Sequence, residues 1–489
     1  MTATSPNRRV DLVVLGGGAA GLSTAIEAAD AGASVLLAEK TAELGGNCRY
    51  SGGNLLSLQG PAALRHLQTL CFGTTDDTVL RSYLQGLHQL PDWLISLGGS
   101  LHHVPHTGEG GRLSECWPYF PGAEGVRYYR VDGTPGESAG QALWHLLEGA
   151  VRDRTVDVRL STRGVRLLQG PDGSVEGVEL ESSHGRFSAE AGSGVVLAVG
   201  GIENDRPSCD AYLPLASVVP ISHLGNTGDG LRMAIAVGAA LWHMSNFYGW
   251  LAFKAEEYSA AFSLSPAAPS YLLVDAAGRR FCDETGSEVH DRIRPLLSIR
   301  PDRPNYPCLP AYLVFDEAVL DAGPLSRGST PNSYRWSPDN RAEIHRGWIS
   351  QGACLDGLCD KITCDAEVLA ATLDRFNTAA DAGHDDDFRR LPKTMAPLDT
   401  SRLYAVPLNP AVSTTCGGPR HDDSGRVLNY DGRPIEGLFA AGGTSAIWGY
   451  LTQHGGGLTD AMVFGRAAAQ AALTGTGSAA RLSRVAGRP

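Results

Sequence analysis

At 489 residues the chain exceeds the usual size of one domain, which predicts two or three structural units with room for a large core. The formal net charge of −12 disfavours a nucleic-acid-binding protein, because neutralising phosphates requires a basic surface. Ten cysteines, none in a C-x-x-C pair, indicate neither a disulfide framework nor a redox dithiol.

The N-terminal stretch MTATSPNRRVDLVVLGGG passes from a basic pair directly into a strand. It lacks the separate apolar region and small-residue cleavage site of a secretory signal. No apolar run approaches the ~18 residues that a membrane-spanning helix needs. We therefore expect a cytoplasmic protein without a membrane span.

Residues 10–40 predict a strand, a glycine turn, an alanine-rich helix and a second strand. Gly16, Gly18 and Gly21 form G-x-G-x-x-G, and the second strand ends at Glu39. In such a βαβ unit the glycines let backbone N–H groups reach a pyrophosphate, and the acid accepts hydrogen bonds from a ribose. An ordinary glycine-rich turn is the alternative interpretation.

Later glycine-rich segments favour FAD over NAD. Residues 43–55 offer a second backbone approach to a long, extended cofactor, and residues 195–205, 225–241 and 437–446 add three more glycine turns. One large ligand wrapped by one domain accounts for all of them. The candidate cofactor contacts are Gly16, Gly18, Ala19, Ala20, Gly21, Glu39, Lys40, Gly45, Gly46, Asn47, Cys48, Ser51, Gly52, Gly53, Val165, Gly200, Asp229, Gly442, Gly443, Gly457 and Leu458.

Taken together, the motifs GGGAAG, GGN-x-x-x-SGGN, TGDG, RRFCDE, GGPRHDDSGRVL and GLFAAGG resemble the flavoprotein family of fumarate reductases and 3-ketosteroid dehydrogenases. The resemblance runs from about residue 10 to residue 473. It implies an α/β fold with a Rossmann-like FAD-binding domain at 1–247 and 411–489. An α+β substrate-binding cap domain would be inserted at 248–410. Where covalent members carry a flavin-linking histidine this chain has Gly46, which implies non-covalent FAD.

The segment LTDAMVFGRAAAQAAL, from Leu458, predicts a helix. Its first N–H groups would meet the anionic edge of the reduced flavin, and Gly456 and Gly457 would clear the approach.

The resemblance also bears on the substrate. Several positions at which fumarate reductases carry cations or imidazoles hold Glu288, Ser413, Thr414 and the region of Trp250 here, which disfavours a dicarboxylate. The segment WGYLT instead resembles ketosteroid dehydrogenases.

Tyr450 and Thr452 of that segment are candidate catalytic residues, because a neutral phenol can donate to a carbonyl oxygen or transfer a proton at the adjacent carbon. The alternative for Tyr450 is packing beside Trp448.

Three further catalytic candidates have structural alternatives. His454 could orient Thr452, bind substrate or cap the loop. Arg280 belongs to a motif that could instead hold the cap to the FAD domain through an ion pair, and Tyr312 begins an expected cap strand that could face the cleft.

These patterns predict an FAD-dependent oxidoreductase acting on CH–CH groups, which introduces or reduces a C=C bond next to the carbonyl of a small molecule. No metal site is expected. The absence of a second G-x-G-x-x-G predicts a separate electron acceptor or donor. The alternatives are a fumarate-reductase-like enzyme for a carboxylic acid, a flavin monooxygenase, and a redox-inert flavoprotein.

Overall fold

The computed structural model describes residues 8–104, 117, 119–215, 217–286, 288–299, 306–328 and 330–475. The first sheet has a parallel core in the order β20-β9-β1-β2-β6, with β19 antiparallel to β20 and an antiparallel pair, β8 and β7, beside β9. Its strands are β1 (Arg8–Leu15), β2 (Val35–Ala38), β6 (Val156–Arg159), β7 (Arg163–Gln169), β8 (Val175–Ser182), β9 (Gly185–Leu197), β19 (Arg426–Leu428) and β20 (Pro434–Ala440).

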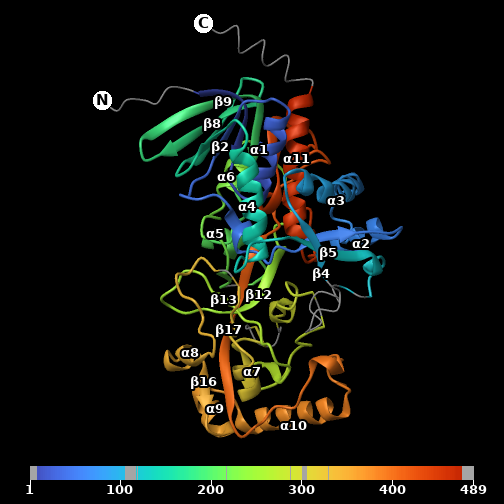
Figure 1. Ribbon diagram of the computed structural model, residues 1–489, viewed down its shortest axis with the longest axis vertical. Coiled ribbons are helices and arrows are strands. Elements are labelled where there is room, and N and C mark those ends of the chain that lie inside the picture. Colours follow the sequence, from blue (N-terminus) through green and yellow to red (C-terminus); the bar gives the residue numbers. More distant parts are fainter. Residues whose placement is uncertain are drawn as a thin grey trace.

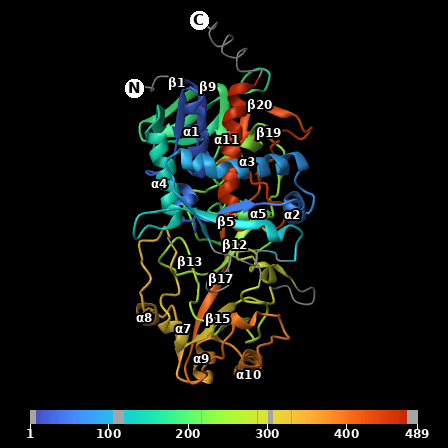
Figure 2. The same ribbon diagram turned by 45° about the vertical axis from the view of Figure 1, so that its right-hand side comes forward.

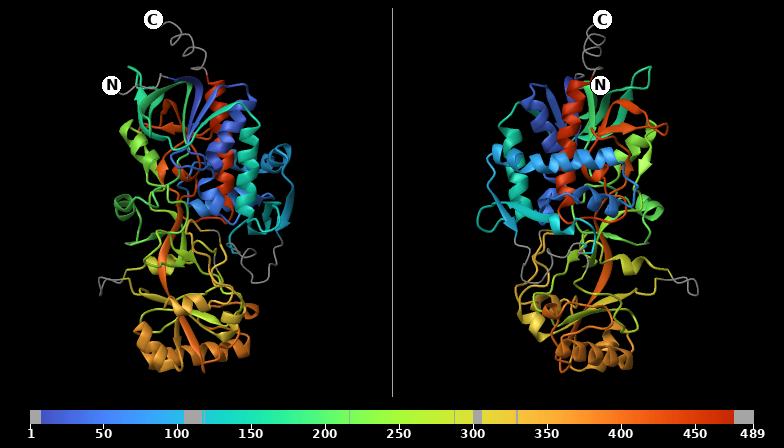
Figure 3. Two further views of the ribbon diagram at one scale, coloured as in Figure 1. Left: turned by 60° about the vertical axis from the view of Figure 1, so that its left-hand side comes forward. Right: turned by 90° about the vertical axis from the view of Figure 1, so that its right-hand side faces the viewer.

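Both faces of this sheet are covered, which agrees with the continuous apolar run in β1. Leu12 and Val14 point into the core beneath the helices, whereas Val13 and Leu15 point into the core shared with β7 and β8. Figure 2 and the two views of Figure 3 show the helices gathered on one side of the sheet. They are α1 (Ala19–Asp30), α3 (Asp77–Ser96), α4 (Ala139–Arg152) and α11 (Gly456–Thr474), and α6 (Asp229–Ala236) adds Met233 and Ala234 to the opposite core.

A small antiparallel sheet extends the helical side in the order β3-β5-β4. Its strands are β3 (Leu55–Leu58), β4 (Leu101–Val104) and β5 (Val126–Val131), next to helix α2 (Ala63–Cys71) and the 3-10 turns η1 (Gly46–Tyr50) and η2 (Ala123–Gly125). The register of β4 and β5 pairs Val104 with Tyr128.

The second large sheet has the order β13-β12-β17-β15-β14, and β10 and β16 also pair with β17. It consists of β10 (Val219–Pro220), β12 (Phe247–Phe253), β13 (Phe262–Ser263), β14 (Tyr271–Val274), β15 (Ala311–Asp316), β16 (Ser350–Gly352) and β17 (Leu403–Thr415). The neighbouring helices are α5 (Arg206–Tyr212), α7 (Glu317–Asp321), α8 (Arg341–His345), α9 (Leu355–Ile362) and α10 (Ala366–Ala382).

The molecule is elongated, and β17 runs along its length. Figure 1 shows the first sheet at one end, helices α7 to α10 at the other, and β17 between them. The remaining elements are β11 (Leu241–Trp242), β18 (Gly418–Pro419), η3 (Arg294–Leu297), η4 (Pro392–Thr394) and η5 (Gly442–Thr444). The expected boundaries at 247/248 and 410/411 fall within β12 and β17, and the division into two domains stays a prediction.

The structure confirms the mixed α/β architecture and corrects one helix start. Helix α11 begins at Gly456 rather than at Leu458, so Gly456 and Gly457 belong to its first turn, after Gly455 in the left-handed conformation (φ 73°). Among the described residues, no helix combines the length and apolar character needed to cross a membrane.

Candidate active site

A cavity of about 510 Å³ lies where the parallel strands of the first sheet end and the second sheet begins. Its floor includes Leu15, Ala38 and Ala198, at or just beyond the carboxyl ends of β1, β2 and β9. Tyr248 and Trp250 of β12 contribute the opposite side. The carboxyl edge of an open parallel sheet is the usual ligand site of this architecture.

The N-termini of α1 and α11 both line this cavity, and neither has a side-chain cap. A Cβ placed on Gly18, the N-cap of α1, would find no neighbour nearer than the Gly45 carbonyl oxygen at 3.9 Å, so the first turn of α1 faces open space. Gly457 and Leu458, in the first turn of α11, also line the cavity. Uncapped backbone N–H groups favour anionic ligand groups such as a diphosphate.

Hydrogen bonds fix the carboxylate of Glu39 just beyond the end of β2. Its Oε2 accepts from the Gly17 amide (2.8 Å), and its Oε1 accepts from the backbone and hydroxyl of Thr41 (both 2.8 Å). Lys40 donates to Asp229 at 2.9 Å, and Arg163 donates to the same carboxylate at 2.7 Å. The positive charges at this end are therefore paired, and burial opposes ionisation of Asp229 but these cations keep its pKa low.

The structure brings most of the expected cofactor contacts together. Every candidate except Gly21, Gly45 and Val165 lines the cavity. Gly21 has a packing role instead, because a Cβ there would lie 1.8 Å from the Gly16 carbonyl oxygen. Because Gly21 has no side chain, α1 can lie directly against the turn that follows β1.

The opposite wall carries an unpaired phenol. The Tyr248 hydroxyl is buried without a hydrogen-bond partner among the described residues, and a Cβ on Gly457 would lie 3.5 Å from it. Desolvation by burial raises the pKa of Tyr248 well above its usual value, so the group remains a neutral donor. A buried donor of this kind is satisfied when a bound molecule accepts its hydrogen bond.

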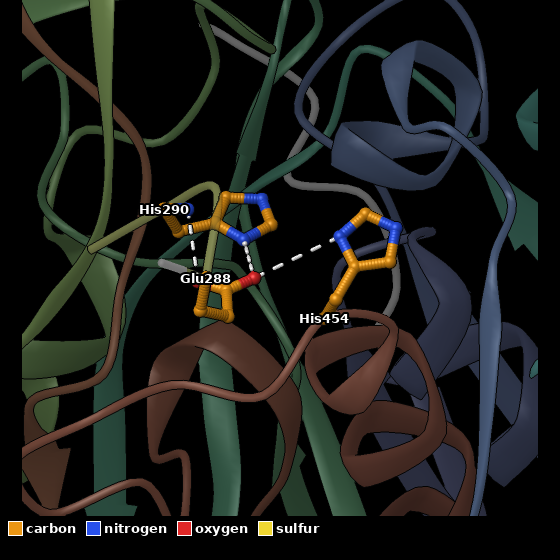
Figure 4. Close-up of side chains that lie close together, drawn as sticks. All are labelled: Glu288, His290 and His454. Carbon is orange, nitrogen blue, oxygen red and sulfur yellow. Dashed lines mark hydrogen bonds and ion pairs between the residues drawn. The ribbon is translucent and has the colours of Figure 1, made fainter. Parts of the chain in front are cut away.

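Glu288, His290 and His454 form a compact cluster beside Tyr248 (Figure 4). The His290 backbone N–H and Nδ1 lie 2.8 Å from the two oxygens of Glu288, and His454 Nδ1 lies 3.8 Å from Oε1. Burial favours the neutral acid, but the interactions with His290 outweigh it and lower the pKa of Glu288. The ionised carboxylate accepts from His290 Nδ1–H, which leaves Nε2 available to a bound molecule.

A chain of polar contacts fixes the tautomer of His454. Arg130 Nε donates to Asn54 Oδ1 at 2.7 Å, so the Asn54 amide must present its NH₂ to His454 Nε2, 2.6 Å away. Desolvation by burial lowers the pKa of His454 to about 3, and the neutral ring therefore carries its proton on Nδ1. That nitrogen is therefore a donor that faces Glu288.

Thr452 lies behind the cluster, fully buried, and does not line the cavity. Its hydroxyl donates to Glu288 Oε2 at 3.2 Å and to Asp291 Oδ2 at 3.2 Å, and its amide donates to the same Asp291 oxygen at 3.1 Å. Burial raises the pKa of Asp291 to about 6. Thr452 thus supports the carboxylate that holds His290.

Tyr450 and Tyr312 do not line the cavity. The Tyr450 side chain is 53% exposed, and its ring centroid lies 5.3 Å from that of Phe72. Its backbone oxygen accepts a hydrogen bond from Arg294. Tyr312 lies in β15 opposite Pro407 and packs against the core beneath α9 and α10.

Arg280 also lies outside the cavity lining, in a buried ion-pair network. It donates to Glu284 and Asp385 at 2.9 and 3.0 Å, and its guanidinium covers the ring of Phe376 at 4.9 Å. Both carboxylates belong to residues 248–410. The expected ion pair therefore exists within this segment and does not join it to the rest of the chain.

The sequence analysis missed Asn54, Arg130 and His290 as site residues. His290 stands two residues after Glu288, the position where the resemblance directs attention to an arginine, and its signal is the pair Glu288-x-His290. Tyr248 belongs to the aromatic segment FYGWLAF. Arg130 has no local signal, because β5 joins the site through tertiary contacts alone.

Comparison with known families agrees with this geometry. The chain belongs to the family described as FAD binding domain, which matches residues 11–458. It is 30% identical over 526 residues to 4-oxocyclohexanecarboxylate 2-dehydrogenase of Sinomonas cyclohexanicum, covering 90% of this chain and 88% of that protein.

Two further comparisons differ in extent. The chain is 28% identical over 473 residues to NADH:fumarate oxidoreductase of Klebsiella pneumoniae, covering 93% of this chain and 46% of that relative, so it spans less than half of that protein's length. Its fold is similar to 3-ketosteroid delta1-dehydrogenase from Sterolibacterium denitrificans in complex with 1,4-androstadiene-3,17-dione (TM-score 0.82, 22% identity). This match covers 95% of this chain and 99% of the other.

The protein is therefore an FAD-dependent oxidoreductase. The residues present fit the cofactor. One cavity contains the open space beside Gly18, the uncapped N-termini of α1 and α11, and the carboxylate of Glu39. The first turn of α1 is suited to the diphosphate, Glu39 to a ribose, and the first turn of α11 to the flavin edge.

Proposed function

We propose that this oxidoreductase introduces or reduces a C=C bond next to the carbonyl of a small-molecule substrate. The observation that carries the proposal is the shared cavity, in which the glycines of the cofactor site face Tyr248, His290 and His454. The names of the relatives support it, since one is 4-oxocyclohexanecarboxylate 2-dehydrogenase and another is an oxidoreductase of fumarate, which contains a C=C bond.

The residues divide the proton chemistry between them. When bound, FAD supplies the site that accepts or releases a hydride. The Tyr248 hydroxyl donates a hydrogen bond to the carbonyl oxygen, which acidifies the neighbouring C–H. In the direction of desaturation His290 Nε2 takes the proton from that carbon, and in the direction of reduction it returns the proton.

The cluster keeps His290 with its proton on Nδ1 and with Nε2 available to the substrate. Glu288 accepts from His290 Nδ1, and this carboxylate stabilises the charge that the imidazole gains when Nε2 takes a proton. His454 stacks on His290 with 5.5 Å between ring centroids and keeps its own proton on Nδ1. We assign to His454 a structural role, as a fixed polar side chain beside His290, the proposed acid/base.

Electrons pass to or from a separate carrier in this proposal. The chain contains one G-x-G-x-x-G, at Gly16–Gly21, and the described cavity accounts for it with FAD. A second dinucleotide-binding unit of the same kind is not present in the sequence.

The test is the visible spectrum of the flavin under anaerobic conditions. Cyclic ketones are added to the oxidised protein, and the matching enones to the dithionite-reduced protein. Bleaching by a saturated ketone establishes desaturation, and reoxidation by an enone establishes reduction. Substrate oxygenation that requires a reductant and O₂ would indicate a monooxygenase, and a flavin that responds to neither set would overturn the proposal.

A further inference from the structure

One arginine in the cavity has no acidic partner. Arg130 lies on β5, lines the cavity and is partly buried. Its Nε donates to the neutral amide of Asn54, and among the described residues no carboxylate is paired with it. Desolvation by burial lowers the pKa of Arg130, as expected for a guanidinium that no carboxylate compensates.

The other cations of the cavity differ from Arg130. Lys40 and Arg163 share the carboxylate of Asp229, at the end of the cavity where Glu39 lies. Arg327 is exposed and donates to the carbonyl oxygens of Pro324 and Ala322. Arg130 instead joins the catalytic cluster through Asn54 and His454, and its positive charge contributes to the low pKa of His454.

We infer that Arg130 binds a carboxylate of the substrate, so that the molecule whose carbonyl meets Tyr248 also carries a negative charge. With Nε engaged by Asn54, the Nη groups can form the two parallel hydrogen bonds typical of a guanidinium–carboxylate pair. The inference rests on the proposed function for the position of the carbonyl.

The experiment measures binding without turnover. Each of three carboxylates (cyclohexanecarboxylate, benzoate and succinate) is titrated into the FAD-loaded protein alongside its amide, and Kd is obtained from the flavin difference spectrum and calorimetry. At least one carboxylate is expected to bind ten-fold or more tightly than its amide. In Arg130→Gln this ratio should fall below three-fold, and Arg130→Lys should fall between the two.

Two control variants separate the charge from other effects. Arg127, exposed on the same strand, does not line the cavity, so Arg127→Gln should keep the wild-type ratio. Asn54→Ala removes the link to His454 but retains the guanidinium, so the preference for carboxylate should survive.

The inference is overturned if no carboxylate outbinds its amide, if Arg130→Gln keeps the ratio, or if Asn54→Ala abolishes it. It is also overturned if Arg130→Gln loses FAD, which would make this arginine a cofactor ligand. Since these titrations require no redox change, their failure is distinct from failure of the bleaching test.

Discussion

The carboxylate of Glu288 organises the residues on which the proposed chemistry depends. It accepts from the ring and backbone of His290 and from Thr452, although its own side chain is fully buried. Such a charge is stable only when donors surround it. The same donors fix His290 with one nitrogen bound and the other available.

Replacing His290 by Gln should lower turnover by roughly 10²- to 10⁴-fold, the range for loss of a general acid or base, while FAD stays bound. Tyr450→Phe is the comparison, because the exposed Tyr450 ring contacts Phe72 rather than the cavity. Its turnover should remain near the wild-type value. Stopped-flow reduction of the flavin measures both, and a large loss in Tyr450→Phe with a small one in His290→Gln would reverse the assignment.

A second histidine makes stability depend on pH. Burial lowers the pKa of His243 to about 4, whereas an exposed histidine titrates near ~6.5. The unfolded chain therefore binds this proton first as the pH falls. The free energy of unfolding should decrease below about pH 6.5, by on the order of 3 kcal/mol at pH 4 from this group.

Urea unfolding at pH 7 and pH 4.5 checks this expectation. The variant His243→Asn tolerates the left-handed backbone at this position (φ 53°) and should lose less stability between the two pH values than the wild type. His184→Asn, at an exposed turn, should lose as much as the wild type. Equal losses in all three proteins would show that His243 does not contribute.

At the scale of single residues, local pattern does not decide which tyrosine lies in the cavity. A neutral tyrosine donor was expected, and the structure places such a hydroxyl in the cavity at Tyr248, whereas Tyr450 faces outward. Both tyrosines lie beside a tryptophan in the chain, so local pattern cannot separate them. Only the pairing of β12 with β17 decides which ring reaches the cavity.

At the level of elements, the N-terminal turns of α1 and α11 carry most of the cofactor site. The βαβ unit around α1 could be predicted because its glycine spacing is local. Strand β5, which brings Arg130 to the cavity, could not be predicted. It reaches the site through its pairing with β3 and β4, and the sequence around it does not signal this pairing.

Gly18, the N-cap of α1, and Gly21, in its first turn, should respond differently to substitution by Ala. Gly18→Ala adds a methyl group to open cavity space, so the apo-protein should keep its stability while FAD affinity falls by at least ~10-fold, about 1.4 kcal/mol. Gly21→Ala places a methyl carbon 1.8 Å from the Gly16 oxygen, which should lower the free energy of unfolding by about 1–3 kcal/mol or more.

Fluorescence titration with FAD and urea unfolding of the apo-proteins distinguish the two effects. If Gly18→Ala destabilised the apo-protein as much as Gly21→Ala does, the space beside Gly18 would serve packing instead of cofactor binding.

On the scale of the whole molecule, FAD should be bound without a covalent bond. Gly46 offers no nucleophile, and burial raises the pKa of the neighbouring Cys48 thiol to about 12, so it remains protonated. Acid precipitation should therefore release all the flavin into the supernatant, and free FAD at 100 times its Kd should raise the free energy of unfolding by about 2.7 kcal/mol. A yellow protein pellet would contradict this prediction.

The contact between α1 and α11 has a consequence for synthesis. The Thr24 hydroxyl donates to the Gly465 carbonyl oxygen at 2.9 Å, and a Cβ on Gly465 would lie 2.4 Å from the Ala20 oxygen, so the helices touch along their backbones. Residues 31–455 separate them. At ~5–20 residues per second, the ribosome takes roughly 20–85 s to make that interval. During this time the apolar side of α1 lacks the cover that α11 later provides, so this part of the core can form only after α11 has been made.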